Sequence, residues 1–168
     1  MPNARIPWLF TAALGAALAL APAAQPRPPL APCSPASAKA AVLAAPALRS
    51  LRPTMRSGGG VDRLICHDLT RDGDDEMAVT IFSGGTAGDI AWAVFGRSNG
   101  KWVLVFKRLD LYKIGLFTLG GDLADSQPVY RKNDPNCCPT GGFDHRRYHW
   151  NGTQFVLARS WHDKRFHP

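Results

Sequence analysis

The acidic run CHDLTRDGDDEMAV, from Cys66 to Val79, holds the most concentrated set of metal-binding side chains in the chain. Its candidate ligands are oxygen-bearing residues at short spacings: Asp68, Thr70, Asp72, Asp74 and Glu76. Calcium takes several oxygen ligands from a sharply turning backbone, and Gly73 stands where such a turn needs a glycine. We therefore expect a candidate calcium site at 68–76.

The spacing D-x-T-x-D-G-x-x-E matches most positions of an EF-hand-like loop, but Val79 stands where the closing bidentate glutamate is expected. It also resembles the D-x-N-x-D-G-x-x-D loop of FG-GAP and VCBS-type repeats, which lies between strands and often holds calcium. Thr70 and Glu76 depart from that pattern, although both keep an oxygen. The alternative is a turn between strands in which the acids accept backbone N–H groups and no metal is needed.

Two histidines follow a pair of adjacent cysteines at a spacing that can be written as a zinc site: Cys137, Cys138, His145 and His149. Adjacent cysteines are poorly spaced for tetrahedral ligation, and export favours disulfides over free thiolates, so we do not predict zinc here. An exposed polar strand face explains both histidines. The chain has no G-x-S-x-G nucleophile motif.

The first 24 residues have the pattern of a secretory signal peptide. Arg5 supplies the positive start, an apolar run rich in Ala and Leu follows, and Ala21 and Ala23 offer a cleavage site. The apolar run is short for a membrane span, so we expect none after cleavage. Residues 25–36 are proline-rich and are predicted to form an extended linker.

The mature chain is expected to be basic. Cleavage removes Arg5, one of 20 Lys and Arg, and none of the 13 Asp and Glu, so the net charge falls from +7 to +6. This balance favours anionic envelope polymers as partners. Solvated surface charge is the alternative, because the basic residues are scattered. No motif predicts specific nucleic-acid binding.

Four cysteines follow the signal peptide: Cys33, Cys66, Cys137 and Cys138. An even number in an exported chain predicts two disulfides, and four cysteines allow three pairings. If the 137–138 segment is extended, the adjacent side chains point to opposite faces. That favours one of them bonding Cys33 and the other Cys66.

The elements that must position these groups are mostly strands. Residues 37–56 are rich in helix formers interrupted by Pro46, which predicts one short helix or two fragments. Residues 60–163 alternate with period two, and Asn-Gly turns at 99–100 and 151–152 mark two hairpins. We predict a mainly β (α+β) fold: an antiparallel meander of six to eight short strands with a short N-terminal helix, and a tail at 164–168.

Alternation also assigns side chains to faces of these strands. Three residues of one strand are expected to share a face: Trp102, Leu104 and Phe106. The same is expected of Phe155, Leu157 and Trp161. The segment 127–132, QPVYRK, is predicted to be a short edge strand because of its proline.

Several short patterns spread over about residues 60–163 belong together: C-x-DLT-x-DG, SGGTAG, W-x-VF, DPNCCPTGG and HWNG-x-x-F. Their combination resembles a group of small exported proteins of actinobacterial type with no assigned activity. The resemblance implies a class but carries no catalytic residue. We expect an exported, disulfide-stabilised, non-enzymatic binding or structural domain. The alternative is a small secreted hydrolase whose His and Asp or Glu residues converge from different strands.

Overall fold

The computed structural model describes residues 31–167. The expected signal peptide at 1–24 and most of the expected linker at 25–36 lie outside the described residues. None of the helices between residues 31 and 167 is long and apolar enough to cross a membrane.

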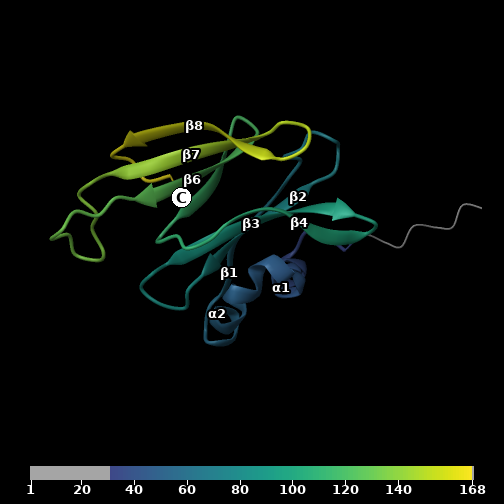
Figure 1. Ribbon diagram of the computed structural model, residues 1–168, viewed down its shortest axis with the longest axis horizontal. Coiled ribbons are helices and arrows are strands. Elements are labelled where there is room, and N and C mark those ends of the chain that lie inside the picture. The colour runs from purple at the N-terminus through teal and green to yellow at the C-terminus, as the bar shows by residue number, and fades with distance from the viewer. Residues whose placement is uncertain (1–30, 168) are drawn as a thin grey trace, which may run out of the picture.

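The chain is arranged in three layers, with short helices below one four-stranded sheet and a second four-stranded sheet above it (Figure 1). The helices are α1 (Pro35–Ala44), η1 (Pro46–Leu51) and α2 (Arg52–Arg56). Ser34 caps α1, because its Oγ accepts the N–H of Ser37 at 3.2 Å. Helix α1 thus starts two residues ahead of the expected position.

Both sheets are antiparallel meanders in chain order. The first contains β1 (Gly60–His67), β2 (Glu76–Phe82), β3 (Asp89–Ser98) and β4 (Lys101–Arg108). The second contains β5 (Gly115–Leu119), β6 (Asp122–Pro128), β7 (Phe143–Trp150) and β8 (Phe155–Asp163). The predicted mainly β, antiparallel fold with short N-terminal helices is confirmed.

The first sheet is the middle layer, and its central strands β2 and β3 are buried on both faces. Met77, Val79 and Phe95 pack against the helices, while Trp92 and Val94 pack against the second sheet. Strand alternation produces this division, because neighbouring residues of β2 and β3 point to opposite faces. The second sheet packs its inner face against the first sheet, and its outer face is covered only in part, by the tail beyond β8.

Two β-bulges correct the face assignments made from alternation. In the β3–β4 register Phe95 pairs with Leu104 and Val94 pairs with Phe106, so Val105 is an extra residue. Phe106 therefore joins the core between the sheets, whereas Leu104 packs with the helices. An extra residue in a bulge reverses the alternation beyond it.

The second bulge lies in β8. Arg147 pairs with Arg159 and Tyr148 pairs with Leu157, which makes Ala158 the extra residue. Trp161 consequently lies on the opposite face from Leu157, on the outer face of the second sheet. The expectation that these two residues share a face is wrong.

The predicted edge strand at 127–132 is also wrong in position. The strand is β6, which ends at Pro128 and lies between β5 and β7 inside the sheet. Its polar composition concealed it, because Asp122, Asp125 and Ser126 are all buried polar residues. Asp125 is held between the sheets by the indole N–H of Trp92, at 2.9 Å, and by Arg108.

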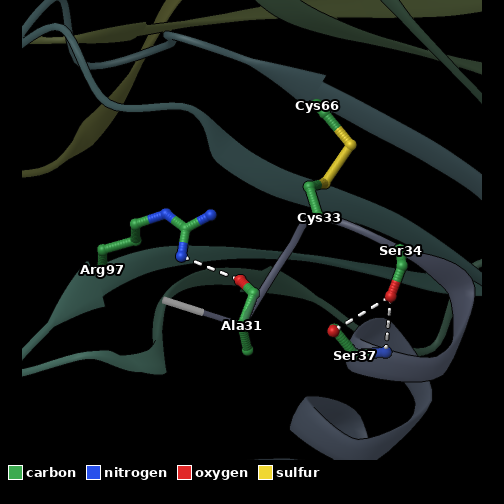
Figure 2. The surroundings of a disulfide bond; sticks show 6 residues. All are labelled: Ala31, Cys33, Ser34, Ser37, Cys66 and Arg97. Carbon is green, nitrogen blue, oxygen red and sulfur yellow. Dashed lines mark hydrogen bonds between the residues drawn. A yellow bond between two sulfur atoms is a disulfide. The ribbon is translucent and has the colours of Figure 1, made fainter. Parts of the chain in front are cut away.

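The disulfide pairing differs from the favoured one. Cys33 bonds Cys66, joining the segment ahead of α1 to β1, and Cys137 bonds Cys138 (Figure 2 shows the first). The premise of an extended 137–138 segment fails, because the N–H of Cys138 donates to the carbonyl of Pro135 in a turn. The two disulfides belong to different sheets: the first is made by Cys66 of β1, and the second lies in the loop between β6 and β7.

Candidate functional site on the outer face of the second sheet

The acidic loop lies between β1 and β2, and most of its carboxylates bind the loop's own backbone. The two Asp68 oxygens accept the N–H groups of Asp72 and Gly73, both at 3.1 Å. Asp72 Oδ1 accepts the N–H of Asp74 at 3.0 Å. Gly73 takes a φ of 92°, which glycine adopts without strain.

Glu76 closes the loop from the start of β2. It is buried, and its Oε2 accepts the N–H groups of Leu69 at 2.8 Å and Thr70 at 2.9 Å. Burial raises the pKa of the Glu76 carboxyl, and these N–H groups offset only part of that rise. The loop thus has the bonding of a self-capped turn, with the five predicted ligands spread along it.

A second set of polar side chains gathers on the outer face of the second sheet. Cross-strand register places Ser126 beside His145, His145 beside Trp161, and Arg147 beside Arg159. Beyond β8 the tail folds back over this face. The His167 N–H lies 3.4 Å from Ser126 Oγ, and the His167 ring lies 5.4 Å from that of Phe117.

These elements line a groove of about 290 Å³. Its walls combine aromatic and basic side chains: Phe117, Leu119, Arg147, Arg159, Trp161 and His167. Strands β5, β7 and β8 and the tail each supply part of it, so the groove depends on the sheet and on the returning C-terminus together.

The two arginines of the groove differ in their partners. Arg147 binds Asp122, with Nε at 2.7 Å from Oδ2, and His149 Nδ1 lies 2.9 Å from the other Asp122 oxygen. Arg159 is exposed, and among residues 31–167 no carboxylate pairs with it. One guanidinium is therefore neutralised, and the other is free to bind an anion.

Asp122 is almost fully buried beneath Arg147, at 3% exposed. Burial by itself would raise the pKa of this carboxyl. The hydrogen bonds from His149 and Arg147, with the charge of Arg147, outweigh burial and lower the pKa below its usual value. Asp122 is therefore an ionised anchor that fixes the direction of Arg147.

Ser126, His145 and Asp163 form a hydrogen-bonded chain beside the groove. Ser126 Oγ lies 3.0 Å from His145 Nδ1, and His145 Nε2 lies 3.1 Å from Asp163 Oδ1. The three groups are those of a hydrolytic triad, but the ring nitrogens are exchanged, because in a triad Nε2 faces the serine and Nδ1 faces the aspartate. However, the Ser126 side chain is 0% exposed, so a substrate cannot reach its oxygen. The chain can fix the ring of His145, and it offers no accessible nucleophile.

His145 is fully buried, which overturns the expectation of an exposed histidine face. The ring of Trp161 stacks on it at 4.8 Å, and the ring of His167 covers it at 5.1 Å. The alternation of faces along β7 agrees with the expectation. The burial of the histidine face does not, because it comes from the tail beyond β8. Cys137 and Cys138 bond each other, so they offer no thiolates to a metal alongside the histidines.

Four residues in or beside the groove are ones that no sequence pattern singled out: Ser126, Arg159, Asp163 and His167. Arg159, Asp163 and His167 are close together in sequence, whereas Ser126 comes from β6, and the four meet through cross-strand pairing and the fold-back of the tail. The spacing from Asp163 to His167 is a local signal that could have directed attention to the C-terminus.

No protein-family model matches the chain, and no curated protein matches it at a significant level. No relative therefore assigns a role to any residue of this groove.

Proposed function

We propose that the chain is an exported, non-enzymatic binding domain whose outer-sheet groove takes an acidic polysaccharide of the cell envelope. The observation that carries the proposal is the guanidinium of Arg159, which no carboxylate pairs with among residues 31–167 and which lies opposite Arg147 in a groove with aromatic walls. Guanidinium groups bind carboxylates and phosphates through paired hydrogen bonds. Because Asp122 already pairs with Arg147, Arg159 is the guanidinium that would take the charge of the ligand.

The aromatic walls favour a sugar polymer over a simple anion. Trp161 and Phe117 present ring surface beside the arginines, and aromatic rings pack against apolar faces while leaving polar edges in water. The guanidinium carbon of Arg159 lies 5.7 Å from the centre of the Trp161 ring. One face of the Trp161 ring is stacked on His145, so an acidic sugar would pack its ring on the other face and place its charge on Arg159.

The hydrolase alternative has weaker support. Histidines and acids do converge from different strands, as that alternative requires. Yet Ser126 and His145 are both fully buried, and the groove is lined by His167 in their place. Two disulfides support the exported state, since such bonds persist in oxidising compartments.

Calcium binding by the 68–76 loop is a second part of the proposal. It is supported by oxygens at alternate positions and by the Thr70 hydroxyl, whose Oγ1 is buried beside the Glu76 carboxyl. Within residues 31–167, however, the carboxylates of this loop do not form a group of three close ligand atoms. A calcium ion would therefore have to draw the loop together, and it would act as a stabilising ligand.

Titration with a polyuronate oligosaccharide tests the groove. Arg159→Ala should weaken its affinity by about tenfold, the value of one charge-assisted hydrogen-bonded contact. Arg49→Ala is the matched control, because it removes the same charge from an exposed position in η1, away from the groove. Equal losses in the two variants would mean that net charge alone attracts the polymer. A neutral glucan of equal length should bind neither the wild-type protein nor the variants.

A further inference from the structure

We propose that His145, Asp163 and His167 form a binding site for a divalent transition metal of the zinc class. Their candidate ligand atoms all lie within 4.8 Å of one another. Of the residues that the structure describes, this is the one group of three His, Cys, Asp or Glu side chains that meets that condition. The inference goes beyond polysaccharide binding, because its ligands do not include the arginines, although His167 also lines the groove.

Two of the three ligands are already at the spacing that a metal requires. Ligands about 2.1 Å from a tetrahedral zinc ion lie roughly 3.4 Å from each other, and His145 Nε2 lies 3.1 Å from Asp163 Oδ1. The backbone N–H of Arg165 also donates to Asp163 Oδ1, at 2.7 Å. Both contacts are made to the same oxygen, so a metal at Oδ1 would replace the His145 contact while the Arg165 N–H still fixes the carboxylate.

Ser126 supplies the orienting partner that metal-binding histidines usually have. Its Oγ lies 3.0 Å from His145 Nδ1, on the side of the ring away from Asp163. When Nε2 binds a metal, the ring proton must reside on Nδ1, where it can be donated to Ser126 Oγ. The stacked ring of Trp161 prevents His145 from turning away.

His167 is the ligand that must adjust. It lies four residues beyond Asp163, and its backbone N–H lies 3.4 Å from Ser126 Oγ, so the tail is already placed over the site. Its candidate ligand atom lies within 4.8 Å of those of His145 and Asp163, so its side chain must move closer to reach ligand distance. The three protein ligands would leave one tetrahedral position for water, as in open zinc sites.

The surroundings select among metals. Two imidazoles and one carboxylate suit zinc, copper or nickel, whereas calcium and magnesium need mainly oxygen ligands. Arg147 and Arg159 line the adjacent groove, and their positive charge opposes any cation held by charge alone. The site should therefore bind Zn²⁺ and ignore Mg²⁺.

Calorimetric titration of the oxidised protein with zinc chloride tests the proposal. The expected result is one equivalent of Zn²⁺ per chain, lost in His167→Ala and retained in His162→Ala. His162 is the matched control, because it forms an exposed two-member pair with Asp144 at 2.8 Å. His167 lies in the tail, so its loss should leave the sheet folded.

A third variant separates ligation from general surface binding. Ser126→Ala keeps all three ligands and should weaken zinc affinity by about 10–100-fold through loss of the orienting bond. The proposal is overturned if the wild-type protein binds no zinc, if His167→Ala binds it as well as the wild type, or if His162→Ala removes the binding. A magnesium titration that gives the same heat as zinc would also overturn it.

Discussion

Arg147 and Arg159 lie directly opposite each other on β7 and β8 and line the same groove. Of these two arginines, only Arg147 pairs with a carboxylate of the described residues 31–167. Like charges placed opposite each other on neighbouring strands destabilise a sheet. Asp122 relieves this repulsion on one side only. An arrangement that costs stability in the free protein is expected where an anionic ligand completes it.

The first prediction concerns this pair. Arg159→Gln removes the repulsion, so it should leave the free energy of unfolding unchanged or raise it by up to about 1 kcal/mol, while weakening polyuronate binding. Urea unfolding and a binding titration on the same preparation check both effects. A marked loss of stability would instead assign Arg159 a structural role.

The second prediction concerns Asp122 and pH. Because the pKa of Asp122 is lowered in the folded state, its ionised form stabilises the fold above the usual carboxyl range. That contribution is lost as the pH falls through the lowered pKa. Asp122→Asn should cost about 1–3 kcal/mol at pH 7, since Arg147 and His149 lose a charged acceptor.

Urea unfolding of the wild type and of Asp122→Asn between pH 7 and pH 2 tests this sign. The two stabilities should converge toward the acid end of the range. Asp144→Asn is the control, because its pair with His162 is exposed at both ends and should contribute little. A stability difference that stays constant down to pH 2 would contradict the assignment.

The third prediction separates the two disulfides. The Cys33–Cys66 bond spans a sequence separation of 33, whereas Cys137–Cys138 has a separation of 1. Loop-closure entropy assigns about 3–4 kcal/mol to the first and little to the second. Paired Cys→Ser changes at each bond, compared by urea unfolding, should show that contrast. Comparable losses would mean that the 137–138 bond organises its loop.

The fourth prediction concerns the acidic loop. If calcium binds, millimolar Ca²⁺ should raise the unfolding midpoint relative to excess EDTA, because a ligand of the folded state stabilises it. Asp68→Asn and Asp72→Asn should abolish that rise, while Asp75→Asn, outside the predicted ligand set, should keep it. An unchanged midpoint in the wild type would leave the loop as a turn capped by Asp68 and Glu76.

The fold could be predicted further than the site, for physical reasons. Local signals identified the hairpins, since the Asn99–Gly100 and Asn151–Gly152 turns depend on adjacent residues. The bulges at Val105 and Ala158 place Phe106 and Trp161 on the faces opposite to those expected from alternation. No local sequence signal in those strands predicts the bulges.

The candidate site depended on long-range contacts. Ser126 meets His145 through β6–β7 pairing, and His167 reaches both through the returning tail. Such contacts are set by sheet register and by the path of the chain after β8, neither of which a linear spacing reveals. Strand β6 was also hard to predict from the sequence, because the buried acids Asp122 and Asp125 break the apolar pattern by which strands are recognised.

The measurement that tests the central claim most directly is an NMR titration of the ¹⁵N-labelled protein with polyuronate. Shifts should concentrate at Arg159, at the indole N–H of Trp161 and along the outer-face positions of β7 and β8. The indole N–H of Trp92, which is buried against Asp125, should stay in place. Shifts centred on the helices or on the β3–β4 hairpin, or no shifts at all, would contradict the assignment of this groove.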